Sequence, residues 1–222
     1  MLYRIGAISD THYPTRVPNL PYDAIAEAFH GVQQIVHLGD IETQLVLEQL
    51  SHIAPVIAVA GDDDKVHLPR KRVLERAGVR IGITHGHRSL WIERVRPLLR
   101  RSLGKPMDAW NGMQADLLRL FQADRVQAIL FGHWHRTYCA WHDGILLFSP
   151  GALYAMTPEA MRWQRAHTAS PLKRLILARH LKRAAQTPER YQFEPTVGTL
   201  TIHEDGRLAT AVKRLPHIGY PR

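Results

Sequence analysis

The chain has 222 residues, of which 45% are hydrophobic and 22% charged, a composition typical of a folded protein with a sizeable core. Its one cysteine, Cys139, excludes an internal disulfide and favours a reducing compartment. No apolar stretch reaches the roughly 20 residues of a transmembrane helix. The N-terminus has no secretion-signal pattern, so we expect a soluble, cytoplasmic protein. The formal net charge of +9 favours acidic partners: nucleic acid, an anionic membrane surface or phosphorylated substrates.

The first half of the chain alternates two kinds of predicted element. Thr43 is a candidate N-cap, and proline and glycine at the two ends of residues 69–78 favour a helix there. Strand, helix, strand at this spacing predicts parallel strands in an α/β sheet. The predicted strands are 3–9, 33–40, 55–62 and 79–86, and the predicted helices are 21–31, 43–52 and 69–78.

The second half is predicted to add helices, one strand and two hairpins within a single domain spanning 1–222. A segment over 157–196 is rich in arginine and lysine and has helical spacing, so we expect a basic helical insertion over or beside the core. His142-Asp143-Gly144 and Glu204-Asp205-Gly206 are turn signals between apolar runs. The remaining elements are helices over 89–104 and 107–123, a strand over 126–135, and hairpins over 137–151 and 196–215.

Polar clusters of one chemical kind follow the predicted strands. In an open α/β sheet, binding sites form at the carboxyl ends of strands, so these clusters are expected to converge. Carboxylate oxygen with imidazole nitrogen suits manganese, iron, zinc or cobalt better than calcium, and a preceding glycine lets the backbone approach an ion closely. The clusters are Asp10-Thr11-His12, Gly39-Asp40, Gly61-Asp62-Asp63-Asp64, Thr84-His85-Gly86-His87 and Gly132-His133-Trp134-His135.

The ordered motifs DxH, GD, G(N)xD, HGH and GHxH resemble those of the calcineurin-like metallophosphoesterase superfamily. They are most similar to its small bacterial and archaeal phosphodiesterase branch. The motifs span residues 10–135, and "FSPGA" at 148–152 resembles a further element of that branch. The resemblance implies an α/β fold with two packed β-sheets flanked by helices, an αββα four-layer sandwich. It does not cover residues 157–196.

The resemblance also implies two divalent metal ions, manganese before iron, zinc, nickel or cobalt. Two ions roughly 3.5–4 Å apart share a water, lower its pKa and neutralise charge on phosphate, so the resulting hydroxide attacks phosphorus in line with the leaving oxygen. Asp40 is expected to bridge the ions. The first ion would take Asp10, His12, Asp40 and His135, and the second Asp40, Asp62, His85 and His133.

The sequence departs from the family pattern at two places in "GDDD". Asp63 stands where many members have a histidine that assists the leaving group, so we take Asp63 and His87 as candidates for that role and Asp40 as the bridging catalytic group. Asp62 stands where asparagine is usual. With Asp10, Asp40, Asp62 and a hydroxide against two divalent ions, the charges sum to zero, which predicts tighter metal binding and weaker attraction of phosphate. Asp64 is expected to orient a ligand histidine.

Several readings stay open at this point. The leading one is hydrolysis of phosphodiesters in a small-molecule or nucleotide substrate. Alternatives are a nuclease or nucleotide phosphodiesterase using the basic surface, and a weakly active or non-catalytic metal-binding scaffold with a protein or membrane partner. The insertion could equally pair two subunits into a homo-oligomer. Trp134 could wall the site against an organic group or simply pack, and His37 could be a packed residue or a neighbour of the site.

Overall fold

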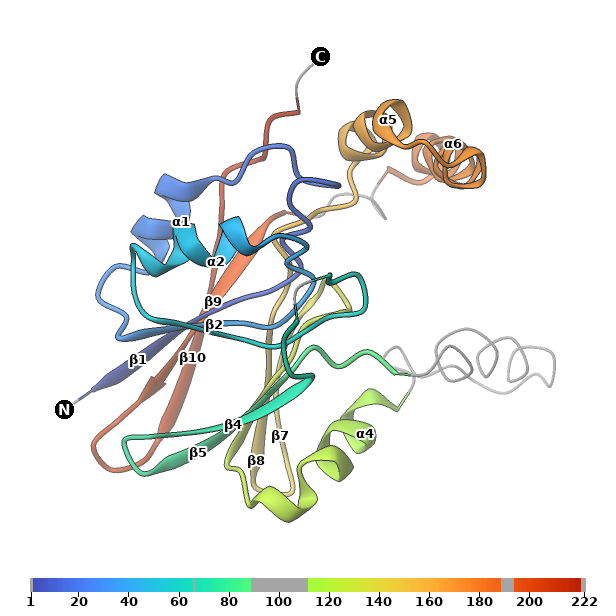
Figure 1. Ribbon diagram of the computed structural model, residues 1–222. Coiled ribbons are helices and arrows are strands. Elements are labelled where there is room, and N and C mark those ends of the chain that lie inside the picture. Colours follow the sequence, from blue (N-terminus) through green and yellow to red (C-terminus); the bar gives the residue numbers. More distant parts are fainter. Residues whose placement is uncertain (1, 66, 89–111, 189–193, 221–222) are drawn as a thin grey trace, which may run out of the picture.

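The computed structural model describes residues 2–65, 67–88, 112–188 and 194–220, and their strands form two mixed sheets (Figure 1). The first sheet has the order β10-β9-β1-β2-β3 and the second the order β4-β5-β6-β8-β7. The first sheet comprises β1 (Tyr3–Ile8), β2 (Gln34–His37), β3 (Val56–Ala58), β9 (Thr196–Ile202) and β10 (Leu208–Arg214). The second comprises β4 (Lys71–Arg76), β5 (Val79–Thr84), β6 (Ala128–Leu130), β7 (Thr137–His142) and β8 (Ile145–Pro150).

Each sheet combines parallel and antiparallel strand pairs. In the first sheet β1 pairs with β2 and β2 with β3 in parallel, with Ile8 opposite His37 and His37 opposite Ala58. In the second sheet β5, β6 and β8 are parallel, whereas β4 and β7 run antiparallel to their neighbours. The strand at 79–84 therefore belongs to the second sheet, and the polar clusters converge from two sheets.

Helices cover the outer faces of the sheets, which gives four layers (Figure 1). One apolar cluster joins the first sheet to α1 and α2, a second lies between the sheets, and a third joins the second sheet to α4. This arrangement confirms the expected αββα sandwich. The helices are α1 (Tyr22–Ala28), α2 (Gln44–Ser51), α4 (Met113–Leu120), the 3₁₀ turn η2 (Gln122–Asp124), α5 (Pro158–His167) and α6 (Pro171–Gln186).

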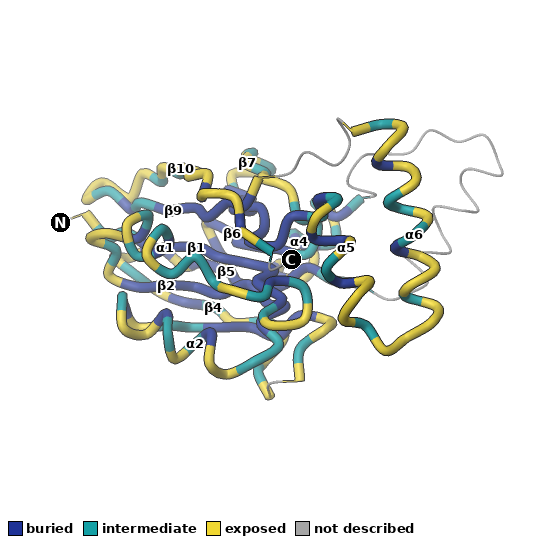
Figure 2. Tube along the Cα trace, turned by 90° about the horizontal axis from the view of Figure 1, so that it is seen from above, coloured by how far each residue is buried: buried dark blue, intermediate teal, exposed yellow. Residues whose placement is uncertain are grey.

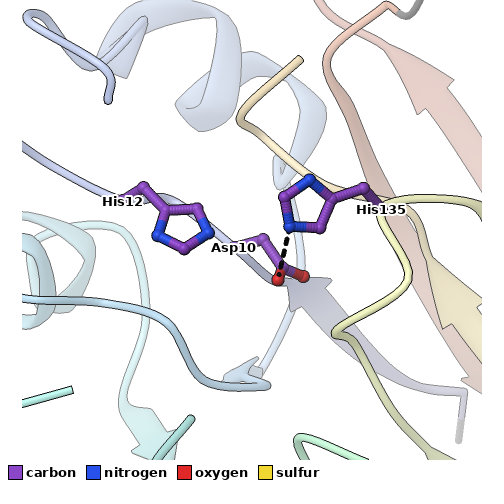
Figure 3. Close-up of side chains that lie close together, drawn as sticks. All are labelled: Asp10, His12 and His135. Carbon is purple, nitrogen blue, oxygen red and sulfur yellow. Dashed lines mark ion pairs between the residues drawn. The ribbon is translucent and has the colours of Figure 1, made fainter. Parts of the chain in front are cut away.

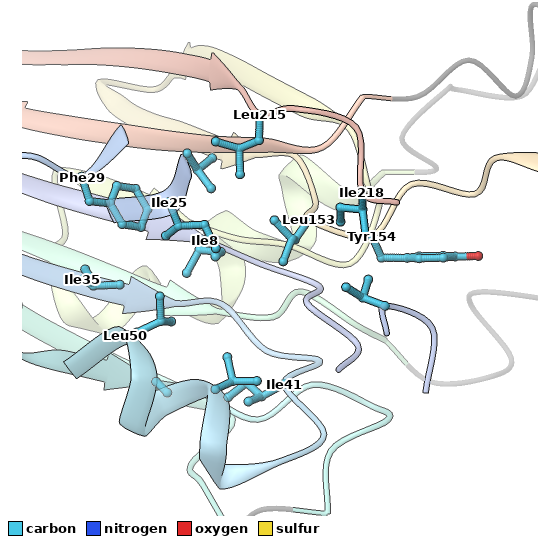
Figure 4. Packing of buried hydrophobic residues seen from close by; sticks show 14 of the residues in the cluster. Ile8, Ile25, Phe29, Ile35, Ile41, Leu50, Leu153, Tyr154, Leu215 and Ile218 are labelled. Carbon is cyan, nitrogen blue, oxygen red and sulfur yellow. The ribbon is translucent and has the colours of Figure 1, made fainter. Parts of the chain in front are cut away.

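The alternation of side chains along the central strands fills both core layers. Ile8 and Ile35 pack toward the helices, where Phe29 of the α1 end and Leu50 of α2 meet them (Figure 4). Their strand neighbours point the other way, and Val36 packs between the sheets. Because successive residues of a strand face opposite sides, a strand buried on both faces is apolar throughout. Thr43 caps α2 as predicted, accepting a hydrogen bond from the Leu45 amide.

The helix predicted over residues 69–78 is wrong, since this segment forms β4. Ala77 and Gly78 have φ of 48° and 76° and connect β4 to β5 in a two-residue hairpin, with Arg76 paired to Val79. Positive φ at both central residues is the geometry that suits the twist of a hairpin. The glycine interpreted as a helix end is therefore a turn residue, and cross-strand pairing decides the conformation of the segment.

The remaining sequence predictions agree with the described residues to different extents. The predicted helix over 107–123 is shorter, beginning at Met113, and its first residues lie outside the described part, as does the helix predicted over 89–104. Two helices, α5 and α6, occupy the predicted basic insertion, and α6 extends beyond the sandwich with much of its surface exposed (Figure 2). None of the helices in the described ranges has both the length and the apolar composition needed to cross a bilayer.

Candidate metal centre

Backbone hydrogen bonds tie the carboxyl ends of the strands together. The Asp10 amide donates to the Gly39 carbonyl at 3.0 Å, and the His12 amide donates to the Asp40 carbonyl at 2.9 Å. The Gly132 amide donates to the His85 carbonyl at 3.1 Å within the second sheet. These bonds continue the parallel pairing beyond the strands, so the polar clusters of each sheet end at one level.

The first group of candidate ligands is Asp10, His12 and His135, whose donor atoms lie within 4.8 Å of one another (Figure 3). His135 places Nε2 at 3.1 Å from Asp10 Oδ1. Asp10 and His12 are fully buried, whereas His135 reaches in from the loop after β6. We call these three residues the first donor set.

The second group is Asp62, His85 and His133, again within 4.8 Å. Asp62 Oδ1 lies 3.1 Å from His85 Nε2 and 3.4 Å from His133 Nδ1. Asp62 is half exposed and His85 fully buried, so the second donor set opens toward the surface.

Asp40 joins the two donor sets through a single oxygen. Its Oδ2 lies 3.3 Å from His12 Nε2 and 3.5 Å from His85 Nε2. Its other oxygen, Oδ1, accepts a hydrogen bond from the Asp63 amide at 3.1 Å, which fixes the carboxylate plane. The structure thus brings all seven sequence-predicted ligands together, with Asp40 in the position expected of a bridge.

Two of the imidazoles are oriented through their Nδ1 atoms. His12 Nδ1 lies 3.0 Å from Glu42 Oε1, and His85 Nδ1 lies 2.7 Å from the Leu38 carbonyl. A proton on each Nδ1 satisfies these bonds, and with a cation bound the electron pair of each Nε2 would face the centre. Glu42, which also accepts from the Thr15 hydroxyl, was missed in the sequence because it lies outside the five clusters, although it follows Asp40 by only two residues.

The ionisation of the centre reflects the mutual pairing of its groups. Burial raises the pKa of Asp10, but the nearby His135, His85 and His12 outweigh burial and leave it well below the usual range. Hydrogen bonds from His133 and His85 hold the pKa of Asp62 far below its usual range. Burial lowers the pKa of His85, yet Asp40 and Asp62 raise it well above the ordinary value. Without a cation, His85 supplies positive charge beside Asp40 and Asp62.

The donor chemistry fits divalent transition metals. Asp10 Oδ2 accepts from the Ser9 hydroxyl and from the His133 amide, whereas the fully buried Oδ1 has no hydrogen bond among the described residues and faces only the Nε2 atoms of His135 and His85, at 3.1 and 4.0 Å. A buried carboxylate oxygen without a donor is costly unless a cation meets it. Oxygen and imidazole nitrogen in this proportion suit manganese, iron, cobalt or zinc.

The backbone of the candidate ligands is strained. Five of them have a left-handed φ, namely Asp10 (54°), His12 (44°), Asp40 (57°), His133 (73°) and His135 (51°). Non-glycine residues seldom adopt this conformation, and each instance costs on the order of 1–3 kcal/mol. Such strain concentrated in one place is typical of a site whose side chains must point to a common centre.

Close approach of the backbone explains two glycines that precede the candidate ligands. A Cβ at position 61 would lie 2.1 Å from Asp40 Oδ1, and one at position 132 would lie 1.9 Å from Ser9 Oγ. Both positions have φ values that other residues also adopt. Glycine is therefore required there because a side chain has no space, and not because of the backbone conformation. Gly61 and Gly132 let the clusters meet at the distance that the donor sets require.

Asp64 does not orient a histidine, contrary to the expectation from sequence. Its carboxylate accepts hydrogen bonds of 2.6–2.9 Å from four backbone amides, those of Asp40, Ile41, Glu42 and Gly61. A carboxylate with this many amide donors acts like a clamp between the loops after β2 and β3. It supports Asp40 through the main chain.

The two candidates for leaving-group assistance lie beside different donor sets. Asp63 Oδ2 is 3.8 Å from His12 Nδ1 and forms an ion pair with Arg16, whose Nη1 lies 3.3 Å from His12 Nε2. The His87 ring lies 5.6 Å from the His85 ring and 6.4 Å from the His133 ring. Arg16 was missed in the sequence because it lies four residues beyond the first cluster and in a segment with no motif.

His37 is a buried neighbour of the site rather than part of either donor set. Its Nδ1 accepts from the Gly39 amide and its Nε2 contacts the Thr11 hydroxyl at 3.2 Å. Burial lowers the pKa of His37 to about 4, so the ring is neutral at neutral pH. It holds together two of the loops that carry the clusters.

Comparisons with known proteins agree with this geometry. The model of the calcineurin-like phosphoesterase superfamily domain matches residues 3–168. A probable metallophosphoesterase of Methanocaldococcus jannaschii is 34% identical over 148 residues, covering 67% of each chain. Vacuolar protein sorting 29 from Cryptosporidium parvum has a TM-score of 0.59 at 17% identity and covers 96% of this chain and 98% of its own. A novel archaeal phosphodiesterase has a TM-score of 0.54 at 18% identity, covering 95% and 99%. The chain belongs to the calcineurin-like phosphoesterase superfamily.

Proposed function

We propose that the protein is a phosphodiesterase that works with two divalent cations. The observation that carries this proposal is the shared oxygen of Asp40, which lies within 3.5 Å of an imidazole nitrogen in each donor set. Asp10, His12 and His135 would hold one cation with Asp40, and Asp62, His85 and His133 would hold the other. The similarity to an archaeal phosphodiesterase structure supports the same class of reaction.

The cations, for which manganese is the expected metal, would when bound supply an activated water nucleophile and neutralise charge at phosphorus. The chain itself supplies the geometry. Glu42 and the Leu38 carbonyl keep His12 and His85 turned with Nε2 inward. Asp64 keeps the Asp40 loop in place, so little reorganisation is needed when a substrate arrives.

The charge of the site favours a diester over a monoester. Three carboxylates and a hydroxide would balance the charge of two divalent cations, so the centre would disfavour a singly charged phosphodiester less than a doubly charged monoester. Arg16 adds a positive charge next to His12, but Asp63 pairs with it. His87, beside the second donor set, is the candidate that donates a proton to the leaving oxygen, since Asp63 is engaged by Arg16.

The test compares a diester and a monoester with the same leaving group. Metal-free protein is reloaded with manganese, zinc, nickel or magnesium and assayed on bis(p-nitrophenyl) phosphate and on p-nitrophenyl phosphate. We expect turnover of the diester with manganese, little turnover of the monoester, and none after chelation. His135→Ala should abolish diester turnover, because it removes a donor from the first set.

His203→Ala is the matched control. His203 follows β9, whose last residue, Ile202, pairs with Tyr3 at the amino end of β1, far along the sheet from the candidate ligands. Unchanged activity is expected for this variant. If manganese-loaded protein hydrolyses no activated diester, the non-catalytic scaffold is the better reading, and if His135→Ala retains full turnover, the donor sets are misassigned.

A further inference from the structure

A pocket of about 380 Å³ opens beside the first donor set. His133 and His135 form part of its wall. Tyr154 stands edge-on to the rings of His12 and His135, with centroids 5.6 and 5.5 Å away, and also faces the pocket. A molecule held at the donor sets therefore lies next to this space, whose volume is at the lower end of the range for small organic ligands.

Apolar and aromatic side chains make up much of the pocket. Trp134, Tyr154, Met156 and Leu177 contribute to its lining. The Tyr154 hydroxyl accepts a hydrogen bond of 2.7 Å from Gln164 Nε2, and both residues are buried. The aromatic wall is therefore fixed before any ligand binds, and a pre-formed apolar surface favours a ligand with a rigid organic body.

The charged groups around the pocket are all positive. Arg16, Arg136 and Lys173 line it, and no acidic side chain does so among the described residues. Arg16 is paired with Asp63, with its guanidinium 5.6 Å from the centre of the Tyr154 ring. The side chains of Arg136 and Lys173 have no acidic partner within the described ranges. Two uncompensated cations at an apolar pocket favour an organic anion.

One wall of the pocket comes from α6, which lies beyond the residues that match the family model. Lys173 and Leu177 are four residues apart and so project from the same face of this helix. Leu177 packs with Met161 of α5, which anchors the helix beside the centre. Helix α6, which the family model does not cover, therefore completes a binding surface next to the donor sets.

We propose that this pocket binds the substituent of the phosphodiester that does not leave, and that this substituent combines an aromatic or apolar body with a second anionic group. A nucleoside carrying a further phosphate has this chemistry. Trp134, Tyr154 and Leu177 contact the organic body, and Lys173 with Arg136 pairs with the distal anion. This inference rests on the proposed phosphodiesterase function and names the class of substrate for that site.

The test uses three diesters that share p-nitrophenolate as leaving group. Methyl p-nitrophenyl phosphate has no organic body, the thymidine 5′-(p-nitrophenyl phosphate) diester adds a nucleoside, and its 3′-phosphorylated form adds the second anion. We expect kcat/KM to rise in this order. In Lys173→Gln we expect KM for the 3′-phosphorylated diester to increase about two- to fivefold, the scale of one partly exposed charge pair. The methyl diester should react as before.

Lys173→Arg should retain the preference for the second anion, and Lys182→Gln, an exposed change on α6 away from the pocket, should match the wild type. The proposal is overturned if Lys173→Gln alters all three substrates equally or none of them. It is also overturned if the 3′-phosphate gives wild-type protein no advantage. If none of the three diesters is hydrolysed, the result contradicts the phosphodiesterase function instead.

Discussion

The carboxylate at position 62 sits where the family pattern has an amide, and the structure shows what surrounds it. Asp62 Oδ1 lies within 3.4 Å of a nitrogen from each of His85 and His133. The same oxygen in an asparagine would be in place but would carry no charge. The Asp62→Asn substitution therefore removes the negative charge from the second donor set while keeping the position of its oxygen.

Asp62→Asn is expected to lower metal affinity while keeping diesterase activity at saturating manganese. We expect the loss in affinity to be roughly tenfold or more, since losing a residue that only orients a ligand already costs about that much. Calorimetric manganese titration and turnover of bis(p-nitrophenyl) phosphate on the same sample check this. A variant that holds two ions and yet has lost all turnover contradicts the idea that Asp62 tunes the charge.

Glu42 illustrates a residue that acts through another. Its Oε1 lies 3.0 Å from His12 Nδ1 and accepts from the Thr15 hydroxyl, so the negative charge strengthens the basicity of the imidazole. Glu42→Gln should reduce manganese affinity by about 10- to 100-fold. The free energy of unfolding of the metal-free protein should change by much less than the free energy of manganese binding.

The matched control for this prediction is Glu48→Gln, a change of the same type at an exposed position of α2. It should leave manganese affinity unchanged. If Glu42→Gln binds manganese as tightly as the wild type, the contact between Glu42 and His12 does not contribute to metal binding.

At the scale of elements, the loops after β2 and β3 are joined through Asp64. Its carboxylate accepts from three amides of the loop after β2 and from the Gly61 amide of its own loop, all within 2.9 Å. Asp64→Asn retains one acceptor oxygen but turns the other into a donor that faces an amide hydrogen. We expect the metal-free protein to lose about 1.5–3 kcal/mol of unfolding free energy, the scale of a hydrogen bond to a charged group.

Chemical denaturation of metal-free protein measures this loss without any contribution from cation binding. Asp205→Asn serves as its control, because Asp205 is an exposed acceptor of the β9–β10 turn that pairs with Arg207. That change should stay within about 0.5 kcal/mol. If Asp64→Asn lowers the free energy of unfolding by as little as this, Asp64 does not hold the loops after β2 and β3 together.

The helices and strands could be predicted where the local sequence pattern agrees with the pairing of strands in the fold. The predictions fail where strand pairing overrides the local pattern. Thr43 capped α2 as its side chain suggested, but the residues between Pro69 and Gly78 form β4 because β5 offers an edge to pair with. The convergence of the candidate ligands could be predicted, because the ends of neighbouring parallel strands meet at one edge of a sheet. Glu42, Arg16 and the amide partners of Asp64 could not, because each depends on how loops fold over one another and leaves no spacing in the sequence.

At the scale of the whole molecule, the centre connects the two sheets. Asp10 and Asp40 follow strands of the first sheet, whereas His85, His133 and His135 follow strands of the second. A cation held by both groups would therefore restrain the relative position of the sheets. Because the layer between the sheets is a single apolar cluster, separating them requires the main core to open.

Metal binding is consequently expected to stabilise the entire fold. At a free metal concentration 100 times the dissociation constant, each ion adds about 2.7 kcal/mol to the free energy of unfolding. For a chain of this length, that corresponds to a rise in Tm of roughly 5–10 °C per ion. Calorimetric scans of one sample with manganese and with chelator measure the shift.

His133→Ala and His135→Ala, which remove one second-sheet donor from each set, should each lose about half of this shift in Tm, while His203→Ala should keep all of it. Because each variant is compared with itself, a general loss of stability cancels, and an unchanged Tm of the wild type on chelation would show that the donor sets do not bind cations.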